Sequence, residues 1–512
     1  MTVAVLTALA RVLRVPYPIL LVVGGSLVGF APGVPDVQLD PDLVLLIFLP
    51  PLLFNAAYFS SLRDLRADMR SITLTAIGLV LVTTCAVAAA AHAAIDGLPW
   101  AAAFALGAIV SPTDPLAATA IARRLGVPRR LTAVIEGESL VNDGTALVAY
   151  RTAVSAAVGG SFDLLDATGD FIVNVAGGIA IGLVTAFIVV QALRRLVSDD
   201  LVGVVTSLAA GYMAYIPAEE VGVSGVLGAV VVGVIVGYRS PELSTPASRL
   251  RGYGFWEVLV FLLNAVLFTL VGLQLPGILS AQDRSALELI GLATLVSAVV
   301  IGMRLLWVNT APYVIRALDR RPAQVARRMS WRPRLIAGWS GLRGSVSLAA
   351  ALALPEAFPE RDLLIFLTLA VIFATLVAQG LTLPLLIRRL DVHDDGVGVR
   401  EELHARREAT AAAIEHLERL SGEDWTRDDS VDRMTRLYQF RHRRLTQRAG
   451  EPGAEEEDNL DERSYAYQRM VREVLEAQRR RVIELRDEGA ISDDVLHSLE
   501  RELDLEDQRL EI

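Results

Sequence analysis

Long apolar stretches separated by short polar ones run through the first three quarters of the chain. A window of about 19 residues, suited to finding transmembrane helices, separates thirteen apolar segments. The first has only about twelve residues, short of the roughly 20 that span a bilayer, so it is either a half-span or the end of a segment that begins upstream. The pattern predicts an all-α polytopic membrane protein with about 13 transmembrane helices, at roughly residues 2–13, 16–31, 42–59, 71–94, 100–123, 130–156, 168–193, 201–217, 222–238, 254–276, 286–315, 334–354 and 363–388.

The last quarter of the chain has a different composition. Residues 391–512 contain 33 acidic residues and 20 arginines, and no apolar run long enough to cross a bilayer. The whole chain has a mean hydropathy of +0.45 and a net charge of −10, so the apolar character belongs to the first part and the acidic character to the tail. We therefore predict a transmembrane domain at 1–390 and a charged, helical cytoplasmic tail at 391–512, for which a regulatory role is one interpretation. The tail's helical pattern includes a hairpin at 463–509.

Arginines alternate along the transmembrane part. About 21 follow odd-numbered segments, whereas two or three follow even-numbered ones. Because cytoplasmic loops carry the excess of basic residues, this predicts a multi-pass protein of the cell inner (plasma) membrane with its amino terminus outside and its tail in the cytoplasm. The predicted partner is therefore membrane lipid. We expect no nucleic-acid partner and no resident cofactor.

Two of the predicted helices contain interruptions. The sequence SPTDP at 111–115 has two prolines, which lack backbone donors and push the preceding residues away from helical geometry. The sequence GWSGLRGS at 338–345 has three glycines around Arg343. Irregular backbone at membrane depth is tolerated only where it lines a cavity or packs against protein. We expect two broken helices with a site between them.

The interrupted segments are the fifth and the twelfth. An odd offset of seven turns the second copy upside down relative to the first, so segments 1–6 and 8–13 fit two inverted six-helix repeats joined by segment seven. Broken helices at matching positions of inverted halves, crossing at mid-membrane, are the sequence sign of a secondary transporter.

Carboxylates gather in the sixth segment, in EGESLVNDGTAL at 136–147. Asp143 lies about 20 Å along a helix that starts near Arg130, at mid-membrane. Charged residues at that depth are rare and mark ion pathways by default. We expect Asp143 to bind either a proton or a cation, the alternative being a salt-bridged structural carboxylate.

Neighbouring polar residues have similar alternatives. Ser139 is a cation ligand or bonds its own helix backbone, and Asn142 supplies a ligand or holds the broken helix. Thr113 offers a hydroxyl and a carbonyl, and Asp114 could neutralise a half-helix end. Glu136, nearer the cytoplasmic end, is expected at a hydrated funnel mouth.

Glu138 is turned about 140° away from Asp143 at 3.6 residues per turn, so it should face a different surface. We expect it to form a buried structural ion pair with Arg343, or with Arg304 as the second choice.

Six ordered stretches resemble those of the monovalent cation/proton antiporter family, the sodium/proton exchanger type, in its bacterial branch. They are FLPPLLFNAAYF at 48–59, SPTDPLAATA at 111–120, EGESLVNDGTAL at 136–147, GVSGVLGAVVVG at 222–233, FWEVLVFLLNAVLFTLVGLQL at 255–275 and WSGLRGSVSLAAALALP at 339–355.

The resemblance implies a thirteen-span inverted-repeat fold, a homodimer, and exchange of a cation for a proton by elevator-like alternating access. It associates the pair Asn142 and Asp143 with electroneutral one-for-one exchange. Thr113 and Ser139 match family ligands, and Glu138 with Arg343 matches a stabilising charge pair.

One position departs from the family pattern, because many relatives carry an acid where this chain has Asn55. If that acid helps to bind the cation, affinity or selectivity here differs. We expect a non-enzymatic transporter that carries H⁺ against Na⁺, with Li⁺ or K⁺ as alternatives, since similar ligands suit all three. A cation channel, or a sensor that signals through the tail, are the remaining alternatives.

Overall fold

The computed structural model describes residues 17–32, 41–159, 164–196, 200–280, 282, 284–318, 329–394, 396–449 and 460–508, all of it helical or irregular with no strand. The first predicted segment, 2–13, lies outside these residues. The chain divides into two compact units, residues 1–394 and residues 395–512.

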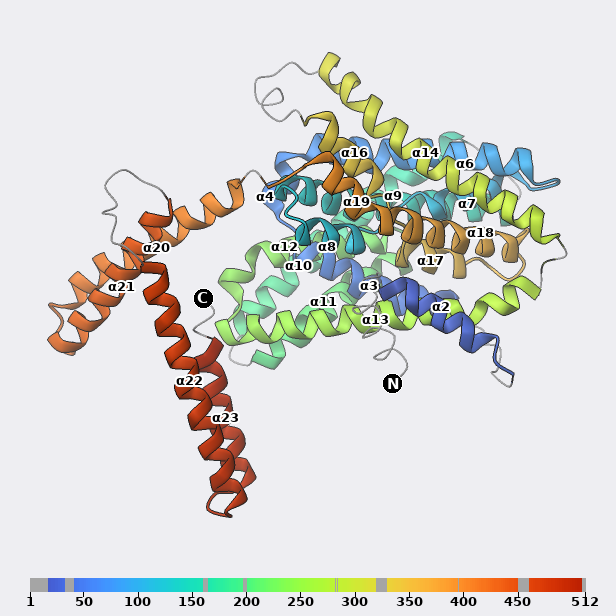
Figure 1. Cartoon of the computed structure of the whole chain (residues 1–512). Coiled ribbons are helices and arrows are strands. Elements are labelled where there is room, and N and C mark those ends of the chain that lie inside the picture. Colours follow the sequence, from blue (N-terminus) through green and yellow to red (C-terminus); the bar gives the residue numbers. More distant parts are fainter. Residues whose placement is uncertain are drawn as a thin grey trace. The chain divides into compact units, whose positions relative to one another are not determined.

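The first unit contains long helices that lie alongside one another (Figure 1). The uninterrupted ones are α2 (Tyr17–Gly29), α3 (Pro41–Tyr58), α9 (Arg129–Gly159), α10 (Leu164–Leu196), α11 (Asp200–Glu220), α12 (Gly225–Leu243), α13 (Pro246–Ser280) and α14 (Ala286–Leu318). Three further stretches are α4 (Leu62–Ala67), α5 (Met69–Thr73) with the π-helix η1 (Leu74–Leu79) and α6 (Val80–Ala94), and α18 (Arg361–Ala374) with the π-helix η2 (Thr375–Gln379) and α19 (Gly380–Leu390).

Both predicted interruptions are present. The fifth segment is two helices, α7 (Trp100–Val110) and α8 (Leu116–Arg124), and the twelfth is α16 (Trp331–Trp339) and α17 (Ser345–Leu352). Proline explains the first break, since Pro112 and Pro115 cannot donate and restrict the residues before them. Gly341 and Gly344 stand in the second.

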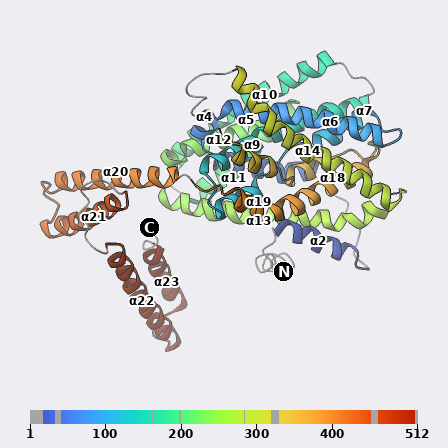
Figure 2. The ribbon, with the colours of Figure 1, turned by 45° about the horizontal axis from the view of Figure 1, so that its top comes forward.

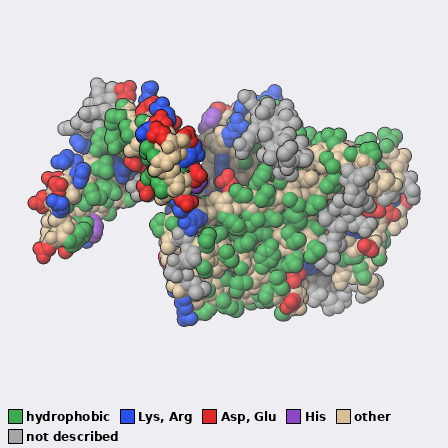
Figure 3. Space-filling view, turned by 90° about the horizontal axis from the view of Figure 1, so that it is seen from below, with side chains coloured by type: hydrophobic (Ala, Val, Ile, Leu, Met, Phe, Trp, Pro, Cys, Tyr) green, Lys and Arg blue, Asp and Glu red, His purple; other side chains and the backbone are tan. Residues whose placement is uncertain are grey.

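Seven helices in the described part of the chain are long and apolar enough to cross a membrane. The split pairs fall outside this set because each half is short, and α9 falls outside because of its charged residues, including Glu136, Glu138 and Asp143. Every predicted segment from the second to the thirteenth nevertheless corresponds to described helix. The surface agrees with a lipid environment: broad hydrophobic areas with few charged side chains cover one face of the first unit (Figure 3).

Helices pack closely where glycine removes the side chain. Between α2 and α13, a Cβ at Gly25 would overlap the Thr269 carbonyl oxygen, and one at Gly272 would overlap the Val22 carbonyl oxygen. Lipid offers no hydrophobic driving force between helices, so such close backbone approach is a main source of their association.

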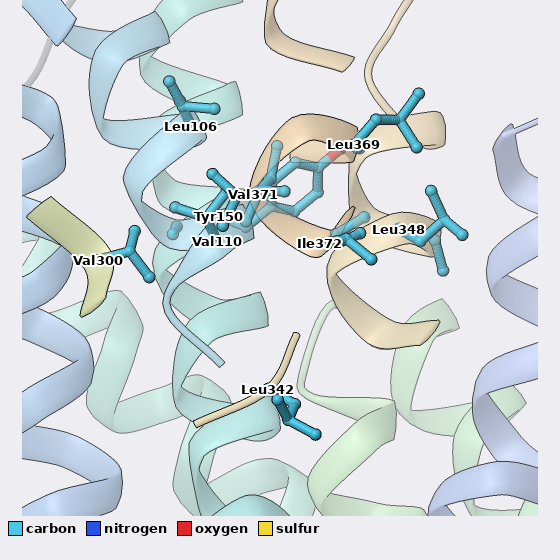
Figure 4. Packing of buried hydrophobic residues seen from close by; sticks show 14 of the residues in the cluster. Leu106, Val110, Tyr150, Val300, Leu342, Leu348, Leu369, Val371 and Ile372 are labelled. Atoms are coloured by element: carbon cyan, nitrogen blue, oxygen red, sulfur yellow. The ribbon is translucent and has the colours of Figure 1, made fainter. Parts of the chain in front are cut away.

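The core lies around the interruptions. Side chains from α7, α9, α14, α17, α18 and the second interruption converge on it (Figure 4), including the fully buried Val110, Val300, Leu342, Leu348 and Val371. The packed surroundings hold the irregular residues 111–115 and 340–344 in one arrangement.

The second unit consists of two helical hairpins, α20 (Val397–Leu420) with α21 (Asp428–Ala449), and α22 (Leu460–Asp487) with α23 (Asp493–Gln508). Each pair lies side by side in both ribbon views (Figures 1 and 2). The predicted hairpin at 463–509 is therefore present. Ser492 caps α23, accepting a hydrogen bond from the Val495 amide at 3.4 Å.

Candidate functional site

The two interruptions touch each other. The Asp114 amide donates to the Leu342 carbonyl oxygen at 2.8 Å, which joins residues more than 200 positions apart. The Asp114 carboxylate then accepts the Leu116 amide at 2.9 Å and the Ser345 amide at 3.4 Å. These amides belong to the first residues of α8 and α17, where backbone donors lack intrahelical partners. One carboxylate thus compensates the positive ends of two half-helices, not one as the sequence suggested.

Helix α9 brings its polar residues to the first interruption. The Ser139 hydroxyl donates to the Thr113 carbonyl oxygen at 2.6 Å, and the Asn142 amide nitrogen donates to the Thr113 hydroxyl at 2.8 Å. Ser139 therefore bonds the broken helix and not its own backbone. Asn142 holds the broken helix, and its side-chain oxygen is buried without a hydrogen-bond partner in the described residues.

Asp143 is buried beside this cluster, with 7% of its surface exposed. Within the described part of the chain, no hydrogen bond or ion pair occupies its carboxylate, which argues against the salt-bridged alternative. A buried carboxylate without such a partner needs a proton or a cation to neutralise it.

A cavity of about 260 Å³, here called the inner cavity, connects these groups. Six predicted site residues line it, namely Asn55, Thr113, Asp114, Glu136, Ser139 and Asp143. Its polar lining side chains carry carboxylate, hydroxyl and amide oxygens, the ligand types that hard cations prefer. The arrangement can hold one small cation against Asp143 or leave that carboxylate protonated.

The first-choice partner of Glu138, Arg343, was wrong, and the second choice, Arg304, is confirmed. Glu138 pairs with Arg304 of α14 through both carboxylate oxygens, with the Arg304 and Glu138 side chains only 1% and 5% exposed. Arg343 instead donates to backbone carbonyls of the two interruptions: Val110 at 3.0 Å, Ser111 at 3.5 Å, and Gly341. Arg343 is needed there because those carbonyls have lost their helical donors.

Two groups that contribute to the site were not predicted from the sequence. The Leu342 carbonyl cannot be recognised from residue type. Arg123, counted only as a loop charge, pairs with Glu136 at 2.5 Å. Its position at the end of α8, thirteen residues before Glu136 on the next helix, was the available signal.

Gly344 is expected to be required for the close packing of the two interruptions. A Cβ at Gly344 would overlap the Asp114 carboxylate, so Gly344→Ala must displace that carboxylate from the Ser345 amide. We expect strongly reduced ion exchange in reconstituted liposomes. Gly302→Ala, where a Cβ meets nothing, is the control, and equal activity of the two variants would contradict the packing argument.

Comparisons with known proteins agree with this geometry. Residues 1–389 match the family model described as sodium/hydrogen exchanger, transmembrane. An uncharacterized Na⁺/H⁺ exchanger of Mycobacterium tuberculosis is 36% identical, over 98% of this chain and 93% of that protein. A sodium, potassium, lithium and rubidium/H⁺ antiporter of Bacillus pumilus is 32% identical, over 80% of this chain and 63% of that protein.

A solved structure shares the fold. The sodium proton antiporter of Methanocaldococcus jannaschii, solved at pH 8, superimposes with a TM-score of 0.57 over 76% of this chain and 95% of that chain, at 18% identity. The family match over three quarters of the chain and the identity to the mycobacterial relative leave one assignment: the chain belongs to the transmembrane sodium/hydrogen exchanger family.

Proposed function

We propose that this protein exchanges Na⁺ for H⁺ across the cell's inner membrane, one ion for one proton, by elevator-like alternating access. The observation that carries the proposal is Asp143, a buried carboxylate with no protein partner among the described residues, in a cavity that also presents Thr113 and Ser139. A single such carboxylate gives one-for-one exchange directly, because a proton and a cation neutralise the same charge and exclude each other.

The proposal includes the wider architecture that the sequence predicts. We assign thirteen transmembrane helices in two inverted repeats, a homodimer, an external amino terminus and a cytoplasmic tail. The contact between Asp114 and Leu342 supports the inverted pairing of the fifth and twelfth segments. The distribution of arginines supports the orientation.

The cation is Na⁺ in this proposal, with K⁺ as the second candidate because the Bacillus relative's name includes potassium. The test is reconstitution of the full chain into liposomes that enclose a pH-sensitive dye. Each of Na⁺, Li⁺, K⁺ and Rb⁺ is added to a preformed proton gradient. Cation-dependent proton efflux is expected, greatest with Na⁺. Current without proton movement would instead identify a channel, and a larger response to K⁺ would replace Na⁺ by K⁺.

Asn55 provides a second test, since it lines the inner cavity at the family's frequently acidic position. Asn55→Asp adds a carboxylate to the cavity, and is expected to lower the KM for Na⁺ roughly tenfold, corresponding to about 1.4 kcal/mol of added attraction. Asn55→Leu, of similar size and without charge, should not lower it. The KM comes from initial rates of dye response over a Na⁺ series, and an unchanged KM in Asn55→Asp would exclude this residue from the cation's surroundings.

A further inference from the structure

A second cavity adjoins the inner one. This outer cavity, of about 380 Å³, is lined by residues of the connection between α3 and α4, by residues of α4, α8 and α9, and by Asp394 at the end of the first unit. Both cavities share Phe59, Arg123 and Glu136 in their linings. These three residues, here called the neck, lie where a path from the arginine-rich side of the protein would pass into the inner cavity.

Two of the three neck residues, Arg123 and Glu136, form an ion pair with each other. The Arg123 Nη2 atom lies 2.5 Å from Glu136 Oε1. Arg123 is the single basic residue among the described residues that line the inner cavity, which also presents Asp114, Asp143 and Glu136. The lining of the outer cavity also includes Arg129, but beyond the neck a cation meets no further basic side chain among the described lining residues on its way to Asp143.

The pair is weak enough to open. The side chains of Arg123 and Glu136 are 69% and 28% exposed. Exposed ion pairs contribute about 0–1 kcal/mol, so separation of this one costs little and happens often at room temperature. This distinguishes it from the buried pair of Glu138 with Arg304, whose separation would leave charges in hydrocarbon.

We propose that Arg123 is an electrostatic gate and Glu136 a transit ligand on the cytoplasmic side. Arg123 rests on Glu136 while no cation is near. An arriving cation competes for the Glu136 carboxylate, Arg123 turns toward the solvent of the outer cavity, and the cation moves on to Asp143. The pair thus sets how readily cations enter from this side, and the inference rests on the proposed exchange function.

The gate predicts that Glu136→Gln and Arg123→Gln change the cytoplasmic KM for Na⁺ in opposite directions. Glu136→Gln leaves Arg123 positive in the path and removes the competing ligand, so the cytoplasmic KM for Na⁺ should rise about tenfold. Arg123→Gln removes the positive charge and should lower that KM several-fold. The double variant should fall between them, and maximal rates should stay within about twofold, because neither residue contacts Asp143 in the described structure.

The measurement uses everted membrane vesicles, in which added Na⁺ reaches the cytoplasmic mouth. The matched control is the ion pair of Arg130 with Asp68, at 2.7 Å, which lines neither cavity. Arg130→Gln and Asp68→Asn should leave the KM unchanged. If the pair of Arg123 with Glu136 is purely structural, both neck variants should lower the yield of protein, and their KM values should shift in the same direction or not at all. KM shifts of the same sign overturn the gate, and so do unchanged KM values.

A second readout does not depend on transport. Leu116→Cys places a thiol in the inner cavity, two turns before Arg123, in a Cys85→Ser background that removes the native cysteine. Modification rates are compared for an ammonium-bearing and a sulfonate-bearing methanethiosulfonate. The ratio of cationic to anionic rates should fall about tenfold with Glu136→Gln and rise with Arg123→Gln. Unchanged ratios in a protein that exchanges ions overturn the gate alone, whereas shifted ratios without any Na⁺/H⁺ exchange retain the gate and overturn the proposed function.

Discussion

Asp143→Asn is expected to abolish cation-driven proton movement while the protein still folds. Asparagine has nearly the same shape as aspartate, but its amide carries no charge, and so it cannot release a proton to a cation. Since the Asp143 carboxylate makes no hydrogen bond or ion pair in the described residues, the substitution removes the exchanged charge without breaking a structural contact. It even removes the cost of a buried charge.

The experiment compares purified wild type and Asp143→Asn in liposomes with an internal pH dye, together with their yields in detergent. Loss of the Na⁺ response at wild-type yield supports the assignment. Asp114→Asn is the informative comparison, because Asp114 accepts two backbone amides and its loss should also lower the yield. If Asp143→Asn retains exchange, the site lies elsewhere.

Competition between proton and cation also fixes a pH dependence. Each proton bound at Asp143 excludes a cation, so the apparent KM for Na⁺ should rise as the pH falls, with little change in maximal rate when Na⁺ is saturating. Initial rates over a Na⁺ series at several pH values provide the test. A KM independent of pH would mean that the two ions bind at separate groups.

Much of the fold could be predicted because hydrocarbon imposes simple rules. Apolar length located most of the helices to within a few residues, although α13 begins at Pro246, eight residues before the predicted start at 254. Proline or glycine located both breaks. Spacing along α9 also separated Asp143 from Glu138 correctly: one lines the inner cavity and the other contacts α14.

The choice of partner for Glu138 shows where the sequence becomes insufficient. Arg304 and Arg343 carry the same charge, and both lie far along the chain from Glu138. What separated them is backbone geometry: the broken helices leave the Val110 and Ser111 carbonyls available, and Arg343 is used there. Which carbonyl oxygens need a donor depends on how the two interruptions pack against each other. Residue types alone do not show that packing.

Glu138→Ala is expected to reduce the amount of folded protein sharply. The variant leaves Arg304, only 1% exposed, without its carboxylate. Removing one member of a buried pair costs about 3–5 kcal/mol, a large part of the 5–15 kcal/mol that stabilises a typical protein. Arg304 also donates to the Ala337 carbonyl at 3.0 Å, so its displacement would loosen α14 from α16 next to the second interruption.

A matched control is available two residues earlier on the same helix. Glu136→Ala breaks the exposed pair with Arg123 and should cost about 1 kcal/mol or less. The double variant Glu138→Leu with Arg304→Met removes both buried charges and should recover yield relative to Glu138→Ala, since apolar replacement of a buried pair is often neutral. Monodisperse yield and thermal transition in detergent are the measurements. Wild-type yield and transition temperature in Glu138→Ala, with exchange lost, would show that Glu138 acts in transport and not in holding α9 against α14.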